Sequence, residues 1–331
     1  MKRIYKKVTL STLSVLVVLA LTVGCKNDIS TSSHSHDVAM HSHGENSHSH
    51  NDTDYFGSYT LVDKQYGTKT VVTVKNNTRK IVTNALPNHE TGTFPNSGNP
   101  NTISAQNRTY TIPLLPKYIG EAKWVREPGF ALNGVKFEPE TAEMVVCESG
   151  ERYRVEAKQD LIAMGLDKNN AHVQPTGAYH YHGTPTSMIE KFDKGEDLVH
   201  IGFAKDGFSI YYSKSGAYTP SFRLYDETRE GEECSYDRPG NHIDVAIADS
   251  DIDGTFVSDW EFVDGLGDLD ACNGTEINGT YAYLVTDAYP YVPRCLMGEF
   301  EEEPHGPPPG QGGASNGQRP PANHIPPHHD H

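Results

Sequence analysis

Short β-favouring runs bounded by turn residues, rather than long stretches of helical periodicity, fill the middle of this 331-residue chain. Such runs are typical of strands, and the 30 glycines, 21 prolines and 18 tyrosines suit turns and strands better than a helical bundle. The runs are Thr68–Val74, Thr109–Leu114, Phe130–Phe137, Ala178–His182, Val199–Tyr212, His242–Ala248 and Thr280–Thr286. They predict a mainly β fold: a β-rich sandwich or barrel-like core with few short helices.

Two stretches predict short helices within this core. Ala157–Met164 has the length of two helical turns. Ser187–Glu190 has the capping-box pattern, in which a Ser and a Glu satisfy the first free amides of a helix, and Gly195 suits its end.

Two polar segments border the core. Lys26–Asp54 is rich in Ser, His, Asn and Asp, and Glu299–His331 is acidic, then rich in Pro and Gly, then rich in His. Neither holds enough apolar side chains to offset the entropy of ordering its backbone, so both are expected to be disordered. The expected organisation is therefore a signal peptide at 1–24, a His-rich leash at 25–54, the core at 55–298 and a tail at 299–331.

The N-terminus has the pattern of an export signal. A basic start, with Lys2, Arg3, Lys6 and Lys7, precedes the apolar run Val8–Val23, which is short for a membrane span. Gly24-Cys25 then resembles the end of a bacterial lipobox, although Thr22 stands where Leu is usual. We expect lipid attachment at Cys25 and a protein anchored in the cell envelope, facing outside the cytoplasm. An ordinary signal peptide followed by a chance cysteine is the alternative.

The four other cysteines fit an exported protein. An even number of cysteines in such a chain predicts disulfides, and the absence of a C-x-x-C pair argues against a zinc–sulfur site. We expect Cys272 to pair with Cys295, because the two flank one predicted strand region. Pairing of Cys147 with Cys234 then follows less securely.

The segment from His172 to His182 carries the strongest chemical signal. Alternate residues of a strand share a face, so His180 and His182 point to one side. A three-residue loop, Pro175-Thr176-Gly177, with Gly177 in the left-handed conformation, would place His172 opposite His180 on that same side. Three convergent imidazoles form an open metal site. A two-residue turn would put His172 on the other face, and surface or core histidines are the plainer alternative.

The same segment carries a family resemblance. Ala178-Tyr179-His180-Tyr181-His182-Gly183, together with the residues that precede it from Leu166, resembles the signature of the YHYH domain family. Further matching stretches are Gly202–Tyr211, Asp253–Val257, Gly265–Gly274, Tyr281–Asp287 and Tyr289–Cys295. The resemblance spans about Gly129 to Gly298, with Ser209 where the family is expected to have Pro. It implies an exported protein and assigns no reaction; metal binding is inferred from the spacing alone.

Several other side chains are candidate ligands. Asp206 or His200 could supply a fourth ligand to the three histidines, although Asp206-Gly207 also reads as a hairpin turn. Calcium is possible at two acidic loops, with plain acidic turns and turn caps as the alternatives. The first loop resembles the start of an EF-hand but has Trp260 at the twelfth position. The possible calcium ligands are Asp249, Asp251, Asp253, Asp268 and Asp270.

These features predict an exported, lipid-anchored protein that captures or buffers zinc or copper. A metalloenzyme with the same three histidines and a cell-surface interaction module with a structural motif are the alternatives. The formal net charge of −16 excludes general nucleic-acid binding, which needs a basic face, and the sequence indicates no particular protein partner. Histidines in both end segments would add weak metal sites, with a solvated polar spacer as the alternative. They are His34, His36, His41, His43, His48, His50, His328, His329 and His331.

Replacing the lipidation cysteine tests the expected anchor. Cys25→Ser should release the protein from the membrane fraction or block its processing, because a serine hydroxyl does not replace the thiol that receives the lipid. Membrane fractionation and lipid labelling measure this. Unchanged labelling and membrane retention would contradict the lipoprotein assignment.

Overall fold

The computed structural model describes residues 53–229, 233–238 and 241–301. The chain divides into two units, Met1–Ser49 and His50–His331, and every described residue belongs to the second. Cys25, the His-rich leash up to residue 52 and most of the C-terminal tail lie outside the described residues, so the fold does not test the predictions made for them. No helix in the described part is both long and apolar enough to span a membrane.

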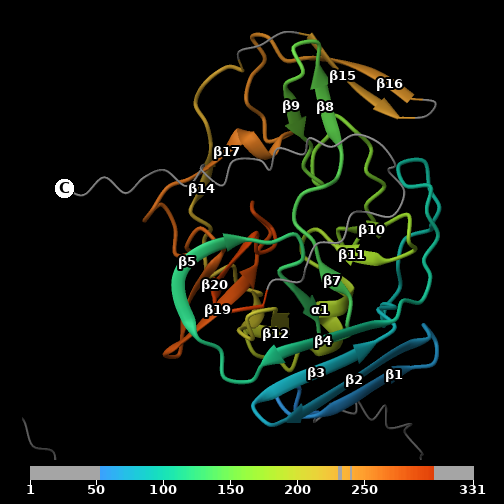
Figure 1. The fold of residues 1–331 in the computed structure, drawn as a ribbon, viewed down its shortest axis with the longest axis vertical. Coiled ribbons are helices and arrows are strands. Elements are labelled where there is room, and N and C mark those ends of the chain that lie inside the picture. The colour runs from blue at the N-terminus through green and yellow to red at the C-terminus, as the bar shows by residue number, and fades with distance from the viewer. Residues whose placement is uncertain (1–52, 230–232, 239–240, 302–331) are drawn as a thin grey trace, which may run out of the picture. The chain divides into compact units, whose positions relative to one another are not determined.

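The described residues are mainly β, which confirms the predicted fold class. They form twenty strands, one α-helix and one 3₁₀ turn, arranged in five separate sheets (Figure 1). The N-terminal sheet is an antiparallel meander in the order β1-β2-β3-β4. Its strands are β1 (Tyr59–Asp63), β2 (Thr68–Lys75), β3 (Thr78–Thr83) and β4 (Arg108–Pro113).

An open eight-stranded sheet forms the centre, in the order β10-β11-β7-β6-β12-β13-β19-β18. The pairs β11–β7 and β13–β19 are parallel, and the other neighbours are antiparallel. Its strands are β6 (Gly129–Ala131), β7 (Lys136–Phe137), β10 (Ala171–Val173), β11 (Tyr179–Tyr181), β12 (Leu198–Ala204), β13 (Ser209–Ser213), β18 (Gly274–Ile277) and β19 (Thr280–Val285). Phe137, Tyr181, Ile201, Ile210 and Tyr283 are fully buried in its core.

Two predicted runs in this sheet are each divided by a turn. Phe130–Phe137 becomes β6 and β7, because Asn133-Gly134 makes a tight turn in which Gly134 has a φ of 85°. Val199–Tyr212 becomes β12 and β13 around Asp206-Gly207, where Gly207 has a φ of 93°. Short Asn-Gly and Asp-Gly pairs inside apolar runs thus mark hairpins rather than continuous strands.

A smaller sheet in the order β16-β15-β8-β9 covers a second apolar cluster that includes Val145, Val155, Tyr236, Ile247 and Phe256. Two further pairs, β14–β17 and β20–β5, complete the fold. These elements are β5 (Tyr118–Trp124), β8 (Met144–Cys147), β9 (Arg152–Arg154), β14 (Phe222–Leu224), β15 (Glu233–Arg238), β16 (Asn241–Ala246), the 3₁₀ turn η1 (Val257–Asp259), β17 (Trp260–Phe262) and β20 (Cys295–Gly298).

Both predicted disulfides are present. Cys272 is bonded to Cys295, which connects the start of β18 to β20. Cys147 is bonded to Cys234, and these two residues are also cross-strand neighbours on β8 and β15. The pairing that the sequence supported less securely therefore fastens the smaller sheet internally.

One of the two predicted helices is wrong. Residues 157–164 are irregular, because Ile162 and Met164 are both buried in an extended stretch and Gln159 uses its side-chain amide to bond both backbone groups of Ile162. The other helix exists as α1 (Thr186–Phe192), but Ser187 lies inside it rather than at its cap. The backbone N–H of Ser187 donates to the Asn169 side chain instead, which ties α1 to the loop before β10.

Asp206 connects the β12–β13 turn to β20 and makes stability depend on pH. Its buried carboxyl accepts hydrogen bonds from Tyr283 Oη at 2.5 Å and from the backbone N–H groups of Gly298 and Phe208. Burial raises the pKa of Asp206 to about 6, although these three donors oppose the shift. Because this value exceeds that of an unfolded Asp, the uncharged form is favoured in the fold. The contribution of the uncharged Asp206 carboxyl to the free energy of unfolding is complete below about pH 4 and is lost as the pH rises through about 6.

We therefore expect wild type to gain stability relative to Asp206→Asn on acidification. The gain should approach about 3 kcal/mol between about pH 7.5 and pH 4, the value of a two-unit shift. Urea unfolding of both proteins across this range measures it. A difference between the two proteins that stays constant with pH would contradict the shift.

Candidate functional site

The β10–β11 hairpin has the predicted three-residue loop. His172 pairs with His180, and Val173 pairs with Tyr179. Gly177 has a φ of 83°, and its N–H donates to the Gln174 carbonyl at 2.8 Å. The loop therefore sets the register in which two of the three histidines lie directly across from each other on one face of the hairpin.

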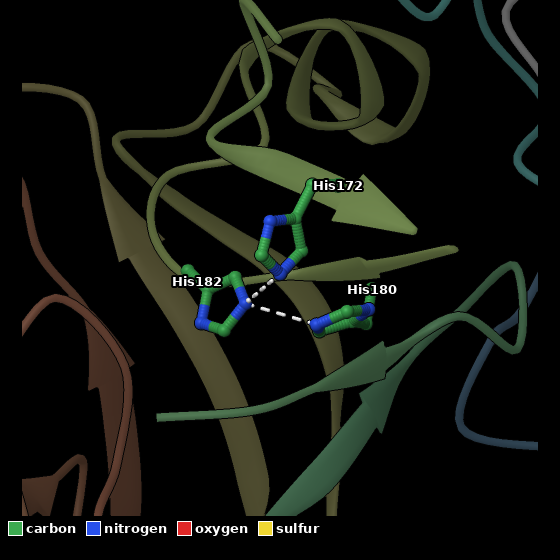
Figure 2. A group of neighbouring side chains, drawn as sticks. All are labelled: His172, His180 and His182. Atoms are coloured by element: carbon green, nitrogen blue, oxygen red, sulfur yellow. Dashed lines mark hydrogen bonds between the residues drawn. The ribbon is translucent and has the colours of Figure 1, made fainter. Parts of the chain in front are cut away.

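All three histidines turn their Nε2 atoms toward one point (Figure 2). His182 Nε2 lies 3.0 Å from His172 Nε2 and 2.9 Å from His180 Nε2. Among the residues that the structure describes, these three form the group of mutually close metal-ligating side chains. The predicted convergence is thus present, and the rings are buried, with 9% of His172, 1% of His180 and 3% of His182 exposed.

Backbone carbonyls on the outer side of the rings fix which nitrogen carries the proton. His172 Nδ1 lies 2.8 Å from the Met164 carbonyl, and His180 Nδ1 lies 3.1 Å from the Ala178 carbonyl. Because a carbonyl only accepts, Nδ1 is the donor in both rings, and each Nε2 presents a lone pair to the centre. A histidine that ligates a metal typically donates a hydrogen bond from its second ring N–H in this way.

The three rings of the cluster are held in their neutral form. Burial lowers the pKa of His172, and it lowers the pKa values of His180 and His182 well below the usual range. The neighbouring rings lower the pKa values of His180 and His182 further, since adjacent positive charges repel. Neutral imidazoles are the form that binds metals.

The geometry fits a tetrahedral ion. Metal–nitrogen bonds of 2.0–2.1 Å at tetrahedral angles place ligand nitrogens about 3.3 Å apart, close to the two Nε2 separations. His182 Nδ1 is the one ring nitrogen of the cluster that is buried without a hydrogen-bond partner among the described residues. A buried water is the usual way to satisfy such a group.

Glu138 lies beside the cluster and was not predicted from the sequence. Its Oε2 is 3.9 Å from His180 Nε2, and only 5% of the residue is exposed. Burial alone would raise the pKa of Glu138, but Lys136 and Arg126 hold that pKa below its usual value, so the group is a carboxylate. In the sequence, Lys136 and Glu138 alternate and so share one face of a strand. That pattern did not place Glu138 near the histidines, because the parallel pairing of β7 with β11 is a tertiary feature.

The two side chains suggested as a fourth ligand lie elsewhere. Asp206 is occupied by the Tyr283 hydroxyl and two backbone amides. His200 stacks on Phe56 with 4.3 Å between ring centroids, and its Nε2 bonds the Gly202 carbonyl. The structure therefore does not bring Asp206 or His200 to the three histidines.

The acidic loops are held by groups of the protein itself. Arg229 donates to Asp253 at 2.7 Å, to Asp259 at 2.6 Å and to the Asp251 carbonyl, so a guanidinium stands among the acids of the loop that contains Asp249, Asp251 and Asp253. Asp268 accepts from the Thr219 amide. Asp270 accepts from the amides of Cys272 and Gly274 and from the Tyr281 hydroxyl. These contacts are those of turn caps, and calcium at either loop stays a prediction.

The tyrosines of β11 occupy the opposite face, as the strand alternation predicts. Tyr181 is fully buried, and its hydroxyl lies 2.6 Å from His89 Nε2 and 3.0 Å from Asn133 Nδ2. Tyr179 donates to Asp167 at 2.7 Å. Both residues are core aromatics with satisfied hydroxyls, so they hold the strand while the histidines face the site.

A segment before β4 clamps the hairpin from outside. Asn99 and Asn101 both donate side-chain amides to the Val173 carbonyl, at 2.9 and 2.7 Å. The Ser104 N–H donates to the Gly177 carbonyl at 2.9 Å. Because these bonds engage the edge strand and its loop, they restrain the position of His172 relative to His180.

Comparison with known proteins gives one match. The family model described as YHYH protein matches residues 109–298, more than half of the chain. The match begins upstream of Gly129, where the sequence resemblance was expected to start, and it contains the three histidines and Glu138. No curated protein and no solved structure matches the chain.

Substituting the loop glycine tests the dependence of the hairpin on its turn. A Cβ at Gly177 would lie 2.0 Å from Ser104 Oγ in a left-handed backbone, so Gly177→Ala combines strain with a clash. We expect a loss of about 3 kcal/mol in the free energy of unfolding. Gly195→Ala is the matched control, because Gly195 is also left-handed but has open space, and it should cost about 1 kcal/mol. Equal losses in chemical denaturation would contradict the clamp.

Proposed function

This chain belongs to the YHYH protein family, and we propose that it binds one divalent transition-metal ion through the Nε2 atoms of His172, His180 and His182. One observation carries the proposal: three buried, neutral imidazoles bring their Nε2 atoms to a common point, and the tautomers of His172 and His180 leave a lone pair on each of those two atoms. A cation at that point would bond all three nitrogens at once, whereas without one the single Nε2 proton of His182 is shared between two acceptors. The outer hydrogen bonds of His172 and His180 to backbone carbonyls support the same conclusion.

The donor set favours particular metals. Three imidazole nitrogens without a thiolate suit zinc and copper, and the low pKa values keep the rings unprotonated in neutral solution. We propose capture or buffering of such an ion, with the His-rich end segments as weak, exposed sites that supply the folded one. Those segments lie outside the described residues.

The proposed location is outside the cytoplasm, with a lipid anchor at Cys25. Two disulfides support an oxidising compartment, since cytosolic thiols are normally kept reduced. The anchor rests on the sequence pattern around Gly24-Cys25.

A second candidate function is that of a metalloenzyme. The observation that favours it is Glu138, a buried carboxylate whose Oε2 lies 3.9 Å from His180 Nε2. An open position on a three-histidine ion, next to a carboxylate, is the arrangement in which a bound water becomes reactive.

Removing one ligand tests the metal site. His180→Ala should lower the affinity for zinc at least about 100-fold, because two imidazoles hold the ion less well than three. Isothermal titration in the presence of a competing chelator measures the affinity, and the chelator keeps weak exposed His pairs from contributing.

Tyr181→Phe is the matched control from the same strand. Its side chain points to the other face, so zinc affinity should stay within about threefold. The lost hydroxyl leaves His89 Nε2 without its partner and removes one of the two hydrogen bonds of Asn133 Nδ2, which costs about 1–3 kcal/mol of stability. A wild-type protein without a tight zinc site, or equal losses in both variants, would refute the proposed function.

A further inference from the structure

Glu138 is held in place from three sides. Its Oε1 accepts from Arg126 Nε at 2.9 Å. Its Oε2 lies 2.6 Å from Lys136 Nζ and accepts from Gln174 Nε2 at 2.7 Å. Lys136 is itself buried, and its Nζ also lies 2.7 Å from Glu127 Oε1. The carboxylate is therefore fixed by partners that are neither the histidines nor a metal.

The position of Glu138 is one shell outside the triad. Its Oε2 approaches His180 Nε2 to 3.9 Å, but Glu138 is not part of the group of donors that lie within 4.8 Å of one another. A direct ligand would have to stand about 3.3 Å from each of the three nitrogens. The carboxylate is thus placed to contact a ligand of the ion. Its bonds from Arg126, Lys136 and Gln174 oppose a movement that would make it a direct ligand.

We propose that a water molecule takes the fourth position of the ion held by the triad and donates a hydrogen bond to the Glu138 carboxylate, three of whose four acceptor sites are taken by Arg126, Lys136 and Gln174. This inference rests on the proposed function. It assigns the position to neutral ligands that carry a proton to donate. An anion without such a proton, such as azide, would meet the Glu138 carboxylate and lose the hydrogen bond. Glu138 is a positioning residue in this arrangement, and it acts through the water.

Cobalt and azide give a direct test on the full chain. Cobalt(II) reports its ligands through its visible absorption, so azide binding at the fourth position can be followed by titration. We expect the Glu138→Gln protein to bind azide at least about tenfold more tightly than wild type, because the repelling charge is gone. Cobalt stoichiometry should stay the same in both.

Glu127→Gln is the matched control. Glu127 pairs with the same lysine and also with Lys205, and within the described part of the chain it forms no ion pair with the three histidines, so its removal takes one charge from the network without removing a group that contacts the triad. Its azide affinity should stay within about threefold of wild type. Equal gains in both variants would mean that general charge, and not the placement of Glu138, controls the position, which would overturn the inference.

A measurement on the unaltered protein decides the matter if Glu138→Gln fails to fold. The copper(II)-loaded wild type should show strongly coupled exchangeable protons by ENDOR in H₂O, and they should vanish in D₂O. A loaded wild type without such protons would overturn the inference and leave metal binding intact. Loss of cobalt stoichiometry in a folded Glu138→Gln protein would make Glu138 a direct ligand and also overturn it. A wild type that binds neither ion would refute the proposed function itself.

Discussion

Three imidazole rings share one buried space at the open end of the β10–β11 hairpin, and the electrostatics of that space constrain what surrounds it. His182 Nε2 lies within 3.0 Å of the Nε2 atoms of His172 and His180, and no ring is readily protonated because burial penalises the charge. The three nitrogens stay this close only while the hairpin keeps the register that pairs His172 with His180. Gly177 provides the left-handed residue of the loop, and hydrogen bonds from Asn99, Asn101 and Ser104 restrain the edge strand.

The two faces of β11 carry different side chains: the tyrosines of one face pack in the core, and the other face carries the histidines. Tyr179 and Tyr181 are anchored through Asp167, His89 and Asn133, so the strand is fixed by groups that the site does not use. His180 and His182 project from the other face. This separation explains how a short strand can present ring nitrogens to one another without slipping, because the stabilising contacts lie behind it.

A layer of charged and polar side chains lies next to the triad. It is formed by Glu127, Lys136, Glu138, Arg126 and the neutral amide of Gln174. Every oxygen of Glu138 has a donor, so a buried carboxylate is tolerated where an isolated one would be protonated. Lys136 reaches the site because β7 runs parallel to β11 and pairs Lys136 with His180. This layer places one fixed carboxylate beside the three ring nitrogens.

The sequence by itself determined the β-rich class, the turn that pairs His172 with His180 and the family, and it favoured the two disulfide pairs that are present, Cys147–Cys234 less securely. These features depend on local periodicity, on turn chemistry between neighbouring residues and on cysteine number. It failed at residues 157–164, where burial of Ile162 and Met164 overrode a helical length. Only the tertiary structure decided the position of Glu138, the removal of Asp206 and His200 from the site, and the guanidinium among the acids near Asp253. Each of these depends on which strands become neighbours, and strand order is set by packing across the whole core rather than by the residues of any one strand.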